Sequence, residues 1–317
     1  MTASTAPLLL LAGLWACGSG EPGPKAAADE ATPPDDGPTE YTYDGGSESA
    51  AVFDADTIEL ALDDAITGVT RVTAAPVLDA YAVALEQMEP GCPDWYEVDG
   101  NAFWYAYCTT DGGSSFDGYG FTTLYEDADA FGDGSAWDLT AISGSATIRD
   151  PDGHTFHLGG GIYDGTGTNP DGARLWVSQV AGGFVWDAPQ AAGTWLAEPS
   201  APSMLLYGIQ YDLGGPENYF YLTGSVEGLS AAASAVRFDE VAIGSTALGL
   251  QCSAEPLGTI SVRDAQGAWW DVRFDVDEGG RLTGDCDGCG GVFTGDTYHG
   301  EVCADFSPLL DWEESPW

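Results

Sequence analysis

The pattern of apolar and polar positions divides the chain into a short helical part and a much longer strand-rich part. From about residue 116 onward, short runs of residues alternate between apolar and polar or are rich in aromatic residues. Gly, Asp and Pro separate these runs, which is typical of antiparallel hairpins. We therefore predict an all-β fold, a hairpin meander or a sandwich, with one or two short helices at its N-terminal side. The main strand candidates are residues 173–177, 204–211, 219–222, 236–241 and 271–276.

Two helices are predicted before residue 91. In the first, apolar residues recur at helical spacing over residues 58–69, with Asp56 as the cap and Gly68 as the end. At the start of this run, apolar residues also alternate with other residues at Ile58, Leu60 and Leu62, which permits a strand instead. In the second, an apolar stripe over residues 78–88 follows Thr73, which can cap the helix.

A disulfide-linked hairpin is predicted next. The turn Asp99-Gly100-Asn101 lies between two runs of aromatic and β-branched residues. Cys92 and Cys108 each lie eight residues from Gly100. This symmetry places the two cysteines opposite each other on one face, within reach of a disulfide.

An internal repeat supports the hairpin interpretation. Residues 144–158 align without gaps with residues 258–272, at an offset of about 114 residues. Each copy predicts a strand, an Arg-Asp turn and a second strand. The shared glycine, Gly153 in one copy and Gly267 in the other, suits a turn position with positive φ.

The N-terminal residues predict export. Residues 8–17 are too short an apolar run to span a bilayer but fit the core of a signal peptide. The run ends in Leu14-Trp15-Ala16-Cys17, which resembles the bacterial lipobox. The resemblance implies that Cys17 becomes the lipidated first residue, and Gly18 after it favours the outer membrane, on the periplasmic or the cell-surface side. A short buried segment of a cytosolic domain is the alternative.

Four regions follow from these patterns. Residues 1–17 are a lipoprotein signal peptide, and residues 18–50, rich in Pro, Gly, Ala and acids, are a disordered linker. Residues 51–115 hold the helices and the disulfide hairpin, and residues 116–317 form the β-rich body. In its scarcity of Lys and its abundance of Asp, Gly and Trp, the chain resembles uncharacterised outer-membrane lipoproteins of high-GC Gram-negative bacteria.

Charge restricts the partners. The chain has 8 Lys and Arg against 51 Asp and Glu, a net charge of -43. Such a surface repels phosphates, so we expect no nucleic acid as a partner and membrane contact through the lipid anchor alone. It also keeps a protein with 11 Trp and 14 Tyr soluble.

With Cys17 set aside for the lipid, six cysteines remain and predict three disulfides, Cys92–Cys108 among them, because an even number in an exported chain favours pairing. The first choice joins Cys289 to Cys303 across a turn and Cys252 to Cys286. The rival joins Cys286 to Cys289 and Cys252 to Cys303. A zinc site of Cys286, Cys289, His299 and Cys303 is a further alternative, which would leave Cys252 unpaired.

Carboxylates lie two residues apart at predicted turns, in the pairs Asp150/Asp152 and Asp285/Asp287. Oxygen-rich turns of this kind could hold calcium, although neither pair completes an EF-hand loop. Ordinary hairpin turns are the alternative interpretation. We expect no other cofactor.

No catalytic residue is assigned. The chain contains no GxSxG, HExxH or GxxxxGK[ST] motif and no GxGxxG motif coupled to a strand. Paired carboxylates for glycoside hydrolysis stay an alternative, because 51 acids supply many pairs.

The aromatic residues suggest a binding surface. Neighbouring residues of a strand point to opposite faces, so adjacent aromatic residues place rings on both sides of a sheet. Exposed rings among acids would suit a sugar or a peptide, whereas packing in the core is the alternative. The candidate ligand-binding residues are Trp176, Trp186, Trp269 and Trp270.

We therefore expect an exported, lipid-anchored cell-envelope protein that acts as a non-enzymatic binding or scaffold module. Its expected partner is a polysaccharide or an envelope protein. A carbohydrate-active hydrolase and a calcium-stabilised adhesion domain are the alternatives.

Overall fold

The computed structural model describes residues 52–98, 101–197, 203–212, 216–244, 255–274, 276–281, 284 and 286–310. Residues 38–317 form one compact unit, and the fold below is that of its described part. The predicted signal peptide, lipidated Cys17 and linker lie outside the described residues. No helix in the described ranges is long and apolar enough to cross a membrane.

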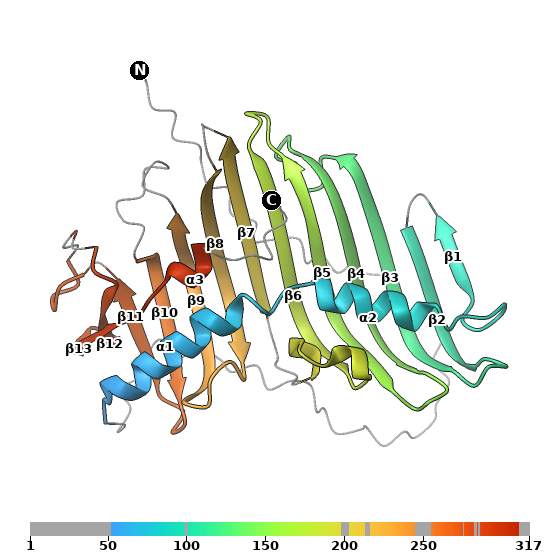
Figure 1. The fold of residues 1–317 in the computed structure, drawn as a ribbon, viewed down its shortest axis with the longest axis horizontal. Coiled ribbons are helices and arrows are strands. Elements are labelled where there is room, and N and C mark those ends of the chain that lie inside the picture. Colours follow the sequence, from blue (N-terminus) through green and yellow to red (C-terminus); the bar gives the residue numbers. More distant parts are fainter. Residues whose placement is uncertain are drawn as a thin grey trace, which may run out of the picture. The chain divides into compact units, whose positions relative to one another are not determined.

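One antiparallel sheet of thirteen strands dominates the described part, and each strand pairs with the next along the chain (Figure 1). The all-β prediction is confirmed, and the order of the strands is that of a meander. The strands are β1 (Trp95–Val98), β2 (Asn101–Thr109), β3 (Ser115–Ala128), β4 (Ala136–Arg149), β5 (Thr155–Thr168), β6 (Arg174–Trp186), β7 (Ser203–Asp212), β8 (Pro216–Glu227), β9 (Ala233–Gly244), β10 (Leu257–Asp264), β11 (Trp269–Phe274), β12 (Cys289–Thr294) and β13 (Thr297–Cys303).

Two helices cover one face of this sheet, as Figure 1 shows. Helix α1 (Ala55–Val69) contacts β9, β10 and β13, and helix α2 (Ala75–Leu85) contacts β4 and β5. Their apolar sides join the inward side chains of the strands in one core. Three short helical segments complete the described part: η1 (Pro189–Ala191), η2 (Trp195–Ala197) and α3 (Ser307–Leu310).

The two helices were predicted at the right places, but their caps differ. Helix α1 follows Asp54, whose carboxylate accepts a hydrogen bond from the Thr57 hydroxyl at 2.8 Å. The predicted cap Asp56 lies inside the first turn, and Gly68 lies inside the last turn. Helix α2 follows Ala74 rather than Thr73.

A row of glycines crosses the helix-covered face of the long strands. Gly120 pairs with Gly144, Gly144 with Gly160, and Gly160 with Gly182. A Cβ atom at Gly160 would collide with the carbonyl oxygen of Ala181, and one at Gly120 would collide with the Tyr81 hydroxyl. The row therefore lets neighbouring backbones and helix α2 approach more closely than side chains would permit.

The same five-residue loop recurs in the chain. Its first residue carries a side-chain oxygen that accepts a hydrogen bond from the N–H of the fifth residue, at 2.8–3.0 Å. Its fourth residue is a glycine with φ between 71 and 97°. The first residue is always Thr, Asp or Asn, types whose side chains bond the backbone in turns. The loops are residues 110–114, 150–154, 169–173, 264–268 and 277–281.

Two of these loops are the predicted repeat. Residues 150–154 connect β4 to β5, and residues 264–268 connect β10 to β11. Both Gly153 and Gly267 have positive φ, at 94 and 90°. The repeat therefore reflects two hairpins with the same loop.

Two predicted disulfides are present. Cys92 bonds Cys108, and Cys289 bonds Cys303. The rival pairing of Cys289 with Cys286 is therefore wrong. Cys286 is also disulfide-bonded, while its predicted partner Cys252 lies outside the described residues.

The expected division at residues 115/116 does not separate two bodies. Strand β3 begins at Ser115 and pairs with β2 as far as Thr123 on one side and with β4 as far as Ala128 on the other. The disulfide hairpin is therefore the first part of the same sheet.

Candidate functional site

The four tryptophans predicted to bind a ligand are buried. Trp176, Trp186, Trp269 and Trp270 are each at most 8% exposed. All but Trp269 belong to the core under the helices. Since none presents a ring face to solvent, the structure corrects the prediction and supports the alternative of core packing for these residues.

Exposed aromatic rings gather instead on β1, β2 and β3. Phe103 lies opposite Phe121, and Tyr105 lies opposite Tyr119. Tyr96 stacks on Phe103, with ring centroids 5.2 Å apart and an interplanar angle of 19°. Each ring is at least 39% exposed. The set, which we call the aromatic face, comprises Tyr96, Phe103, Tyr105, Tyr107, Tyr119 and Phe121.

Strand periodicity and helix α2 together decide which rings face outward. Alternate residues of β2 point to opposite sides of the sheet. Trp104 points toward α2, where its Nε1–H donates to the Tyr81 hydroxyl oxygen at 2.9 Å. Burial raises the pKa of Tyr81, which keeps this hydroxyl protonated. With Trp104 fixed in the core, Tyr105 and its alternate neighbours project from the opposite face.

Small residues occupy the same face of the next three strands. In register rows that begin at Phe121 and Tyr119, the following positions carry only serine, glycine or alanine. We call this set the small-residue strip: Ser143, Ser145, Gly159, Gly161, Ala181 and Gly183. The strip leaves the backbone of β4–β6 accessible beside the rings.

A second buried cluster lies on this face, farther along the strands. Trp137, Leu139, Leu175 and Val177 pack together beneath Phe131. The rings of Phe131 and Trp137 meet edge to face, with centroids 5.2 Å apart. The cluster therefore ends the open part of the face at the loop between β3 and β4.

A small cleft lies on the opposite, helix-covered side. It has a volume of about 40 Å³ and is bounded by Trp186, Phe156 and Gln87, among others. At its polar end, His154 Nδ1 lies 2.9 Å from Asp150 Oδ2. The hydrogen bond to Asp150 raises the pKa of His154. Burial acts to raise the pKa of Asp150, but the hydrogen bonds from His154 outweigh it and lower that pKa.

The predicted calcium residues are only partly brought together. Asp150 and Asp152 lie with His154 in a group whose ligand atoms are within 4.8 Å of one another. Both oxygens of Asp150 are already bonded to His154, one to its backbone N–H and one to its ring. The second pair is not assembled in this way: Asp287 accepts a hydrogen bond from the Cys289 N–H, and Asp285 lies outside the described residues.

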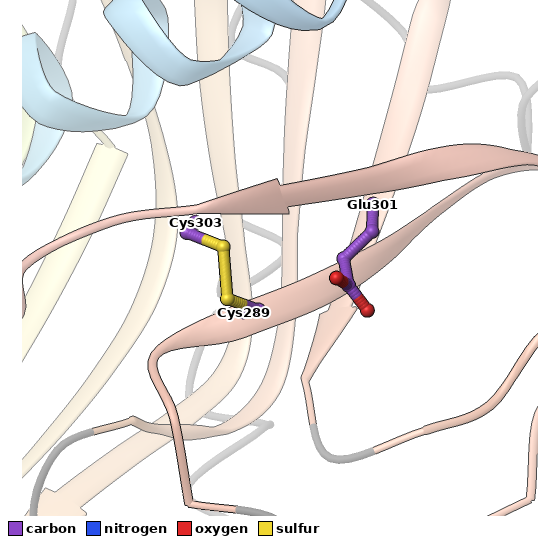
Figure 2. A group of neighbouring side chains, drawn as sticks. All are labelled: Cys289, Glu301 and Cys303. Atoms are coloured by element: carbon purple, nitrogen blue, oxygen red, sulfur yellow. A yellow bond between two sulfur atoms is a disulfide. The ribbon is translucent and has the colours of Figure 1, made fainter.

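The zinc interpretation is excluded by a covalent bond. Figure 2 shows the sulfur atoms of Cys289 and Cys303 joined to each other, with Glu301 beside them. A zinc ligand must be a thiolate, and a disulfide sulfur is not one. His299 bonds Thr294 through Nε2 at 2.6 Å and packs edge to face on Trp270.

One partly buried acid has a strongly shifted pKa. Asp164 of β5 lies opposite Ser178 of β6, on the helix-covered face. Burial raises its pKa from 3.8 to about 6, against the opposing effect of the hydrogen bond from Ser178. The Ser178 oxygen in turn accepts the Ala74 N–H at 2.8 Å, which ties Asp164 to the start of α2.

Comparison with known proteins adds no assignment: no family model matches the chain, and neither a curated protein nor a solved structure matches it. The aromatic run Phe103-Trp104-Tyr105 is present in the sequence, but the ligand-binding residues predicted were four tryptophans elsewhere in the chain. Tyr, with its polar hydroxyl, tolerates exposure better than Trp, but this preference alone does not decide whether Trp104 or Tyr105 faces solvent.

Proposed function

We propose that the chain is an exported, lipid-anchored protein of the cell envelope that acts as a non-enzymatic binding module, with the aromatic face as its binding surface. The observation that supports the binding surface is the exposure of six rings in adjacent register positions of one sheet face. Exposed apolar patches of this kind mark interaction sites. The strands hold the rings in place, so binding costs little ordering of the protein.

The anchor follows from the lipobox resemblance. Lipidated Cys17 would hold the chain at the outer membrane, and residues 18–50 would connect it to the rest of the chain.

The anchor is tested by Cys17→Ser. In a Gram-negative host, we expect the wild-type chain to incorporate an alkyne-labelled fatty acid and to enter the detergent phase. The variant is expected to lose both properties, because serine offers no thiol for lipidation. Equal labelling of the two proteins would contradict the proposed anchor.

Binding is tested with the full chain in detergent and a washed envelope fraction from a Gram-negative bacterium. We expect the fraction to retain the chain. The double variant Tyr105→Ala, Tyr119→Ala is expected to lose about tenfold or more in affinity, because two stacking surfaces are lost. Trp95→Ala is the matched control, since Trp95 is an exposed ring of β1 on the other side of the sheet. Equal loss in both variants would contradict the assignment of the binding surface.

The hydrolase alternative has weaker support. Among the described acids, Asp164 has the pKa of about 6 that suits a general acid. Its carboxyl group, however, is bonded to Ser178 on the face that the helices cover. We therefore do not assign it a catalytic role.

A further inference from the structure

The aromatic face and the small-residue strip form one continuous surface. From β2 to β6, one register row runs Phe103, Phe121, Ser143, Gly161, Ala181, and the next runs Tyr105, Tyr119, Ser145, Gly159, Gly183. A third row runs Tyr107, Asp117, Thr147, His157, Val185. Along each of the first two rows, large rings therefore give way to residues with almost no side chain.

This surface is nearly free of charge in a strongly charged protein. The three rows contain one carboxylate, that of Asp117, and neither Lys nor Arg. The whole chain carries 51 acids and a net charge of -43. A cationic partner would find few carboxylates here to pair with, and an anionic polymer would be repelled by the rest of the molecule. A second copy of the chain would be repelled for the same reason.

The polar groups on this surface are hydroxyl groups, which suit an uncharged ligand. Four of the six rings are tyrosines, and serine or threonine hydroxyls lie beside them on β4. Aromatic ring faces suit the apolar C–H faces of sugar rings, and hydroxyl groups can donate to and accept from sugar hydroxyls. Because Gly159 and Gly161 have no side chains, a flat polymer can lie against the strands beside the rings.

We propose that this surface binds a neutral glycan chain that lies across β1–β6, stacked on the aromatic face and resting on the small-residue strip. The inference rests on the proposed function and specifies its ligand class. Tyr105 and Tyr119, adjacent in register, supply the central stacking faces. Ser143 and Ser145 bond the sugar hydroxyls.

The test uses the full chain in detergent and the envelope fraction described above, before and after exhaustive digestion with protease. We expect retention to survive digestion, and neutral glycan fragments released from that fraction to compete for binding. The variant Tyr105→Phe, Tyr119→Phe is expected to stay within about threefold of the wild type, because it keeps the rings. Tyr105→Ala, Tyr119→Ala is expected to lose about tenfold or more.

Each other outcome has a definite meaning. Retention that disappears after protease digestion would overturn the glycan proposal in favour of an envelope protein, while the proposed binding function would stand. Competition by the anionic polysaccharides alginate or dextran sulfate, but not by the neutral fragments, would overturn the proposal that the ligand is a neutral glycan. Absence of retention by the untreated fraction would overturn both the glycan proposal and the proposed function.

Discussion

Replacing Asp264 with alanine is expected to lower the free energy of unfolding by about 3–5 kcal/mol, because three buried or partly buried donors lose one charged acceptor. Asp264 is 6% exposed. Its Oδ1 accepts the N–H groups of Gln266 and Ala268 at 2.9 and 2.8 Å, and its Oδ2 accepts the Trp270 Nε1–H at 2.8 Å. Alanine would leave the indole N–H of a buried tryptophan without this partner.

Denaturant unfolding at neutral pH measures the loss, and the chain supplies its own control. Asp277 begins the same five-residue loop in an exposed setting, where its carboxylate accepts the N–H groups of Gly279 and Arg281. Asp277→Ala is therefore expected to have a much smaller effect. Asp264→Asn keeps an oxygen for the loop, as Asn169 does in its own loop, but loses the second acceptor. Equal losses for Asp264→Ala and Asp277→Ala would show that burial does not determine the cost.

Asp164→Asn is expected to stabilise the protein at about pH 8 and to have little effect at about pH 4. The pKa of Asp164 is raised from 3.8 to about 6 in the folded protein, so its contribution to stability is present below about pH 4 and is lost as the pH rises through about 6. This shift corresponds to about 3 kcal/mol between the two limits. Asparagine is a neutral analogue of the protonated acid and avoids the penalty.

The measurement is the difference in unfolding free energy between wild type and variant across this pH range, which cancels the titration of the other acids. Asp117→Asn is the control, because it removes one negative charge from an exposed position of β3. We expect its difference from wild type at about pH 8 to be smaller than that of Asp164→Asn, because an exposed carboxylate keeps its hydration in the folded protein. A pH-independent difference for Asp164→Asn would mean that this carboxyl group is hydrated in the folded protein.

Local patterns predicted much of the fold. Helical spacing located α1 and α2, and the symmetry about Gly100 identified the Cys92–Cys108 bridge. The repeat at residues 144–158 and 258–272 identified one loop type, since its glycine must adopt positive φ. Such features depend on residues that are close in sequence, where propensity and turn chemistry act directly.

The binding surface could not be predicted in the same way. The alternation in β2 shows that Trp104 and Tyr105 face opposite sides, but not which side is covered. That choice depends on α2, whose Tyr81 meets Trp104 across 23 residues of chain. Three of the four selected tryptophans, Trp176, Trp186 and Trp270, are buried for the same reason, because large rings fill the core where helices cover the sheet. Likewise, cysteine spacing permitted zinc, whereas the register of β12 and β13 places Cys289 opposite Cys303.

The strand order also has a consequence for how the chain folds. Because each strand pairs with its sequence neighbour, the sheet can grow by adding one strand at a time, and each step closes only the segment that joins two consecutive strands. Helix α1 is the exception. Its Glu59 accepts the Cys303 N–H at 3.2 Å, across 244 residues. In a chain made from its N-terminus, α1 must therefore wait for β13 before this contact can form.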